Sequence, residues 1–323
     1  MRILKRLLPY LVFALVVIGG VSLWLQRENV LDWWSLRGYD PAQPIAQLAE
    51  DTAMSGYGRR LFYVNKPTLD DKEAFNVNCA GIMAEAAVLG CYRGDRLGIH
   101  VYRVTEERLY GIEQVTAAHE MLHQAYDRLS QRERERINRL LQEFLEHGLN
   151  DQGVRDKLAL YEHEGPEVVL NEMHSIFGSE VADLPNELER HYAQYFTDRS
   201  QVVAFRDRSR AAFTEYRNQI LTYDAQLEEL QQQIEQNESV LASQLNTLNQ
   251  RREELDRMLA ADRVEEYNAG VPGFNDMVTA YNRLLDQTTG LVAQYNRLVE
   301  ERNAVAVQVT DLNAALDSRL TPQ

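Results

Sequence analysis

The residues best suited to chemistry are two histidines and a glutamate in VTAAHEMLHQAY, residues 115–126. Residues four apart share one face of an α-helix, so His119 and His123 could bind one metal ion together. Glu120 lies about 100° around the helix from His119. Its carboxylate could therefore take a proton from the attacking water, as zinc-dependent hydrolysis requires. The surrounding uncharged residues favour a buried active-site helix, and the alternative is a helix with two structural histidines.

Several elements must position this helix. AEAAVLGCY (84–92) and LGIHVYRV (97–104), separated by RGDR, predict a β-hairpin directly before it. Upstream, residues 45–58 favour a helix, and the β-rich RLFYVN (60–65) favours a strand. After residue 108 the pattern predicts further helices, at 130–150, 167–178 and 184–199. The fold class that follows is mainly α with a small β-sheet.

Two long runs of heptad-spaced apolar residues follow residue 200. The stretch NAGVPGF, residues 268–274, interrupts them. Two helices joined there should fold back into a long antiparallel hairpin. We interpret the hairpin as a stalk or spacer rather than a dimerising coiled coil, because a tight turn lets the two arms cover each other.

The stretch TAAHEMLH, residues 116–123, resembles the zincin metallopeptidases. The resemblance covers roughly residues 55–200, and it implies an α+β catalytic domain. His119 and His123 would bind Zn²⁺, Glu120 would activate water, and the strand LGIHVYRV, as an edge strand, would pair with a peptide substrate. The metzincin branch is excluded, because Leu129 stands where that branch places a third histidine.

The third zinc ligand is expected from the helix VLNEMHSIFG, residues 169–178. The gluzincin branch takes a glutamate from a later helix, and Asn171-Glu172 matches its Asn-Glu pair. That branch also places an acid four residues further on, but Ile176 stands here, so no residue is predicted to support the ligands. Glu172 and His174 point about 200° apart and cannot both bind one ion. We favour Glu172, with His174 as the runner-up. The remaining alternatives are His163 and Glu180.

The chain begins with features of a membrane anchor. Residues 7–25 have no charge and are long enough to cross a bilayer as a helix. Basic residues precede them, which predicts a single-pass protein with its N-terminus in the cytoplasm and its catalytic domain outside. A cleaved signal peptide is the alternative, and it would also export the chain. In an oxidising compartment, Cys79 and Cys91 would form a disulfide, the alternative being two buried thiols.

The overall charge of the chain bears on its partners. With 34 Lys+Arg against 49 Asp+Glu, the net charge of −15 argues against a nucleic-acid partner.

The expected domains are an anchor (1–26), a linker (27–44), a zincin-like domain (45–204) and a coiled-coil hairpin (205–323). The function predicted is a membrane-anchored zinc endopeptidase acting on proteins or peptides. The alternative is an envelope scaffold whose hairpin binds a partner and whose zinc domain is not catalytic. Tyr192 or His191 could stabilise the oxyanion, or simply pack.

Overall fold

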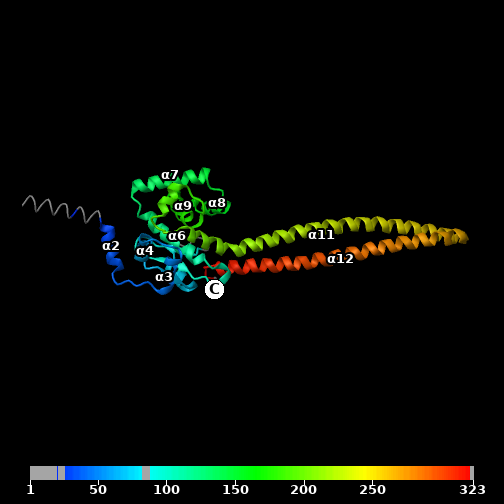
Figure 1. Cartoon of the computed structure of the whole chain (residues 1–323). Helices are drawn as coiled ribbons and strands as arrows, with labels where there is room; N and C mark the ends of the chain where they lie inside the picture. The colour runs from blue at the N-terminus through cyan, green and yellow to red at the C-terminus, as the bar shows by residue number, and fades with distance from the viewer. Residues whose placement is uncertain (1–19, 21–25, 82–87, 321–323) are drawn as a thin grey trace, which may run out of the picture. The chain divides into compact units, whose positions relative to one another are not determined.

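The computed structural model describes residues 20, 26–81 and 88–320 (Figure 1). The chain divides into two compact units. The first unit contains Met1–Ala211 together with Ala314–Gln323, and the second contains Ala212–Asn313. Helices dominate, with one small sheet in the first unit and a long antiparallel helical hairpin, which confirms the predicted fold class.

Three short strands form the sheet, in the order β1-β3-β2: β1 (Thr68–Asp70), β2 (Gly90–Tyr92) and β3 (Ile99–Tyr102). The antiparallel pair β2–β3 confirms the predicted hairpin within the described residues. However, β1 pairs with β3 in parallel on its other side. Because both edges of β3 already hydrogen-bond to neighbouring strands, the prediction that this strand pairs with substrate is wrong.

Four helices precede the HExxH motif in the described part of the first unit after residue 25: α2 (Arg27–Leu36), α3 (Gln43–Asp51), α4 (Gly56–Val64) and α5 (Lys72–Asn78). The predicted strand at 60–65 is wrong, because most of it belongs to α4. Ser55 caps this helix by accepting a hydrogen bond from the Gly58 amide, and Leu61 and Phe62 are fully buried. The predicted helix at 45–58 is instead broken near Ala53, whose φ is +49°.

The helix α6 (Ile112–Asp127) carries the HExxH motif and lies at the centre of the first unit. In Figure 1, α7, α8 and α9 lie on one side of α6, and α3 and α4 lie on the other. The bounds of the elements that follow the sheet are η1 (Glu107–Leu109), α7 (Gln131–His147), α8 (Gln152–Ala159), η2 (Glu162–Glu164), α9 (Pro166–Glu180) and α10 (Asn186–Tyr192). Packing on both sides explains why the residues around the motif are uncharged.

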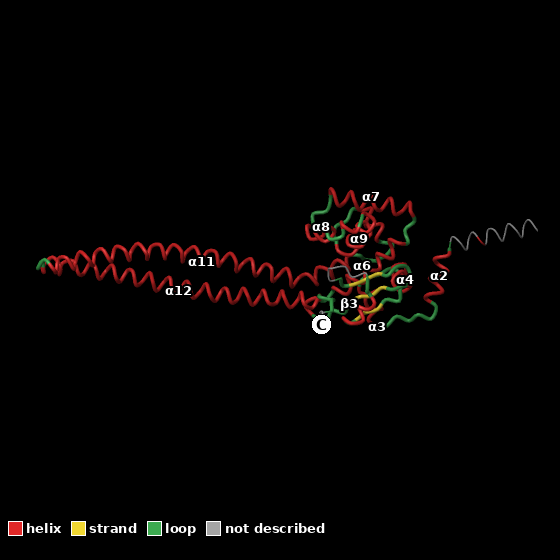
Figure 2. Tube along the Cα trace, turned by 180° about the vertical axis from the view of Figure 1, so that it is seen from behind, coloured by secondary structure: helices red, strands yellow, loops and turns green. Residues whose placement is uncertain are grey.

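The hairpin consists of α11 (Ser200–Ala260) and α12 (Val264–Leu316), which run side by side in Figure 2. Its arms are linked by Arg302 Nε, which donates to Asp224 Oδ1 at 3.0 Å. The chain turns at residues 261–263, where Asp262 has a φ of +59°. The predicted turn at 268–274 is wrong, because α12 continues through it with Pro272 inside the helix. Gly270 is needed there for close packing against Leu255.

The predicted disulfide is confirmed. Cys79 and Cys91 are bonded and buried, and they tie the end of α5 to β2. By contrast, the prediction of a single-pass membrane protein is contradicted. Within the described part of the chain, no helix is both long enough and apolar enough to cross a bilayer. Residues 7–25, from which that prediction came, lie outside the described residues except for Gly20.

Candidate metal centre

Three side chains from two helices converge on one point. The Nε2 atoms of His119 and His123, both on α6, are 3.0 Å apart. Glu172 on α9 places Oε2 at 3.4 Å from His119 Nε2 and Oε1 at 3.5 Å from His123 Nε2. All three residues offer a ligand atom within 4.8 Å of the others. We call His119, His123 and Glu172 the metal group.

Close packing of α6 against α9 brings the metal group together. Gly178 on α9 has no side chain, and an added Cβ would lie 2.5 Å from Leu122 Cδ1 of α6. Gly111 directly precedes α6 and has a φ of +109°, and an added Cβ there would lie 2.5 Å from the carbonyl oxygen of Phe205. Both glycines therefore allow a close approach that a larger residue would prevent.

The donor set fits a zinc ion. Two imidazole nitrogens face each other, and Oε2 of Glu172 is buried without a hydrogen bond of good geometry from any described residue. Burial alone would raise the pKa of Glu172, but His119 and His123 hold that pKa below its usual value. Two histidines and one glutamate with an open fourth position form a known catalytic arrangement for zinc.

Asn171 supports one of the histidines, and the sequence did not predict this role. Its Oδ1 lies 3.0 Å from His123 Nδ1. A proton on Nδ1, donated to this oxygen, would leave the Nε2 lone pair free for a metal. Such partners fix the ring and increase its basicity as a ligand. The available signal was the position of Asn171 directly before Glu172.

Glu120 is a separate carboxylate beside the metal group. Its side chain is buried, and burial raises the pKa of Glu120 to about 7, with His123 and the Tyr92 backbone amide opposing the rise. Gly90 faces the same carboxylate, since an added Cβ would lie 2.5 Å from Glu120 Oε1. The β2 strand thus packs directly against Glu120.

The sequence did not predict a role for two tyrosines near the metal group. The ring of Tyr92 stacks on His123, with centroids 6.3 Å apart and planes 7° apart. Tyr161, between α8 and η2, is half-buried. Burial raises the pKa of Tyr161, and the carboxylates of Glu172 and Glu120 raise it further. Neither tyrosine lies in a motif that would have drawn attention to it.

The other predicted candidates lie elsewhere. His174 is fully buried, and its Nε2 is 2.9 Å from His191 Nε2. Tyr192 is also fully buried and donates its hydroxyl to the His174 carbonyl at 2.8 Å. These three residues are therefore part of the core. His163 is exposed on η2, and Glu180 accepts hydrogen bonds from Lys157 and Arg210.

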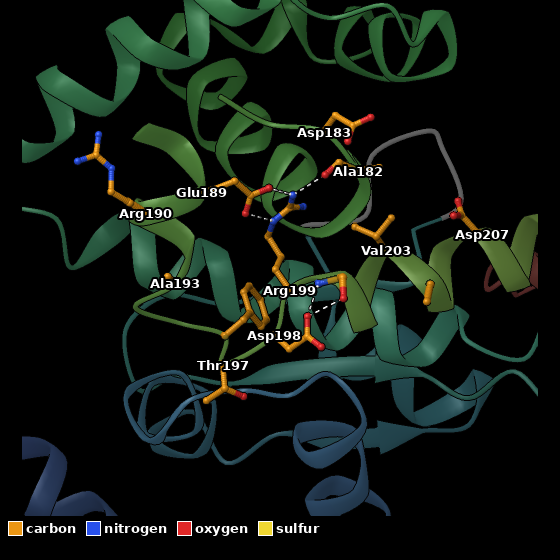
Figure 3. Close-up of a pocket in the computed structure, with 13 residues that line it drawn as sticks. Ala182, Asp183, Glu189, Arg190, Ala193, Thr197, Asp198, Arg199, Val203 and Asp207 are labelled. Carbon is orange, nitrogen blue, oxygen red and sulfur yellow. Dashed lines mark hydrogen bonds and ion pairs between the residues drawn. The ribbon is translucent and has the colours of Figure 1, made fainter. Parts of the chain in front are cut away.

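A separate hollow of about 700 Å³ opens between the 182–200 segment and α11, and Figure 3 shows its lining. Arg199 is held there by Glu189 and by the carbonyl oxygens of Val181 and Ala182. Asp198 accepts a hydrogen bond from the Ser200 hydroxyl at 2.6 Å. Because Arg199 is paired with Glu189 within the fold and no member of the metal group lines the hollow, we do not assign chemistry to it.

Known proteins give no further guidance. No protein-family model, no curated protein and no solved structure matches the chain. The function is therefore inferred from the side chains around the metal group.

Proposed function

We propose that this chain is a zinc-dependent peptidase. The observation that supports the proposal most strongly is the metal group of His119, His123 and Glu172 with the separate buried carboxylate of Glu120 beside it. A purely structural zinc site is usually closed by four Cys or His ligands and needs no additional base. Three ligands and a nearby carboxylate are instead what hydrolysis requires.

The proposed chemistry assigns a role to each side chain. Zinc, when bound by the metal group, would act as a Lewis acid on a carbonyl oxygen. Glu120 would accept a proton from the attacking water and pass it to the leaving amine. Asn171 would keep His123 in the tautomer that binds metal.

A peptide substrate fits the outer edge of β2. The backbone groups of Leu89 and Arg93 bond toward β3, through Tyr102 and Gly98 respectively. In an antiparallel pair these groups alternate in direction, so those of Gly90 and Tyr92 face away from β3, at the outer edge of the sheet. An extended peptide pairing with this edge would place a scissile bond beside the metal group. We therefore propose that β2, and not β3, pairs with the peptide substrate.

The decisive test replaces Glu120 with Gln. The change keeps the shape and removes the base, so zinc should remain bound at one equivalent while peptide hydrolysis falls by about 100-fold or more. The measurements are metal content after dialysis and cleavage of a fluorogenic peptide library. Glu146→Gln, an exposed carboxylate on α7, is the matched control and should keep full activity. Full activity in Glu120→Gln would leave the non-catalytic scaffold as the better function.

Tyr161 would donate a hydrogen bond to the oxyanion that forms during attack, in place of the buried Tyr192. Tyr161→Phe should lower kcat by about 10- to 100-fold with little change in KM, because the interaction exists mainly in the transition state. Steady-state kinetics on a cleaved peptide measure both constants. An increase in KM alone would show that the phenol only binds the ground state.

A further inference from the structure

The helix α12 carries a second heptad series in addition to the residues that face α11. The series follows steps of three and four, and it alternates small or branched apolar residues with asparagine or threonine. Its members are Val271, Asn275, Val278, Asn282, Leu285, Thr289, Val292, Asn296, Val299, Asn303, Ala306 and Thr310. We call this series the second seam. It lies about 100° around the helix from the face that packs against α11.

The middle of the second seam is exposed, whereas Val278 and Val299 on either side of it are half-buried. Leu285 is 42% exposed and Val292 is 39% exposed. All four asparagines are exposed, and no hydrogen bond joins their side-chain amides to the part of the chain that the structure describes. Apolar side chains over such a length remain in contact with water unless another surface covers them.

The uncharged character of the second seam distinguishes it from the rest of the hairpin. No member of the series is charged over residues 271–310. The opposite flank of α12 carries five charged residues: Asp276, Arg283, Arg297, Glu301 and Asp311. The equivalent positions of α11 also carry charge, for example Arg217, Glu228 and Glu238. Positions that flank a coiled-coil seam are commonly charged, so an uncharged flank indicates a second contact.

We propose that the second seam binds the same seam of a second copy of this chain, so that two hairpins associate through their α12 helices. A series with a seven-residue repeat over about 60 Å can be followed only by another heptad helix of similar length. The chain supplies such a helix in its own α12, and the new contact continues the heptad packing that already joins α11 to α12. An amide is both donor and acceptor, so each asparagine can pair with its own counterpart.

The spacing also determines the direction of the pairing. From each asparagine or threonine to the next apolar residue the step is three, and from that residue to the next polar one it is four. The polar positions therefore correspond to a, and the apolar positions to d. Parallel helices align a with a and d with d, so Asn282 meets Asn282 and Leu285 meets Leu285. Antiparallel helices would place Asn282 against Val299, where the amide would lack a partner.

Repeated asparagines at a positions fix register but weaken association. We therefore expect a dimer that dissociates on dilution within the micromolar range. Sedimentation velocity of the full chain across a concentration series measures this. The double substitution Leu285→Glu and Val292→Glu should weaken association by at least 10-fold, because it places like charges against each other. The matched control, Gln287→Glu with Gln294→Glu, lies on the exposed side of α12 that points away from the second seam and should behave as the unmodified chain.

Two results of the sedimentation experiment would overturn the proposal. One is an unmodified chain that stays monomeric up to about 100 µM, which would assign the seam to a different partner. The other is a Leu285→Glu, Val292→Glu variant that associates as well as its control. Circular dichroism should show equal helix content in all variants, so that loss of association cannot result from unfolding.

Oxidative cross-linking tests the direction. Both native cysteines are disulfide-bonded, so an introduced cysteine is the only free thiol. Asn282→Cys should give a covalent dimer on mild oxidation, and Asp286→Cys on the exposed face should not. Antiparallel pairing would be shown if Asn282→Cys fails to cross-link with itself but cross-links with Val299→Cys in a mixture.

Discussion

At the residue scale, the choice of the third metal ligand depends on two positions of one helix. Glu172 and His174 are two residues apart on α9, so their side chains point in nearly opposite directions. Glu172 faces His119 and His123, whereas His174 faces His191 in the core. Burial also lowers the pKa of His174 well below its usual value, which keeps the ring neutral as a core group.

This arrangement predicts different consequences for the two alanine variants. Glu172→Ala should lower zinc affinity by about 100-fold or more, because it removes a ligand. His174→Ala should retain zinc and lose about 2–4 kcal/mol of folding free energy, because it leaves a cavity and an unpaired His191. Metal content and urea unfolding are measured side by side, with the exposed Glu167→Ala as control. Loss of zinc in His174→Ala alone would make the site a three-histidine one.

At the element scale, the metal group depends on how closely α6 and α9 approach. Gly178 is a point of close contact, since an added Cβ would lie 2.5 Å from Leu122 of α6 and 2.6 Å from Tyr192 of α10. Gly178→Ala should therefore destabilise the fold by about 1–3 kcal/mol. Zinc affinity should fall too, because Glu172 moves away from the two histidines.

The control for this prediction is Gly290→Ala on α12, where an added Cβ meets nothing within 4 Å. That substitution should leave stability unchanged or raise it by up to about 1 kcal/mol, because alanine favours helix. Chemical denaturation and competitive zinc titration measure both variants. If Gly178→Ala is as stable as Gly290→Ala, the helices do not need this contact.

At the scale of the whole molecule, the two ends of the hairpin helices belong to the first unit. Arg210 of α11 forms an ion pair with Glu180 of α9 at 2.5 Å. Beyond α12, the Ser318 hydroxyl donates to the Val88 carbonyl at 2.6 Å, close to β2. These contacts lie outside Ala212–Asn313, which forms a unit by itself.

Removal of the second unit should therefore leave the metal group intact. A chain in which residues 212–313 are replaced by a short Gly/Ser linker should fold cooperatively and bind one zinc ion. A chain that ends at residue 199 should be less stable, because it loses the contacts of Arg210 and Ser318. Thermal unfolding and metal content distinguish the two. An unfolded or metal-free product of the internal replacement would show that the hairpin completes the catalytic unit.

Local patterns in the sequence were sufficient for several features. The four-residue spacing of His119 and His123 places both rings on one side of any helix, and heptad periodicity predicts two long packed arms. The pair Cys79 and Cys91 was predicted from its even number, its short spacing and the expected oxidising compartment, and the disulfide is present. Each of these depends on residues close in sequence or on a strict repeat, which is why no knowledge of the fold was needed.

The remaining features of the fold and of the metal group depend on the tertiary structure. The parallel pairing of β1 with β3 joins residues about 30 positions apart and has no local signal, so the central place of β3 could not be predicted. RLFYVN has the composition of a strand, but burial of Leu61 and Phe62 and the Ser55 cap favour a helix. The positions of Asn171 and Tyr161 near the metal group depend on the packing of α9 against α6. Long-range contacts decide such features because their energy exceeds the weak local preferences of a few residues.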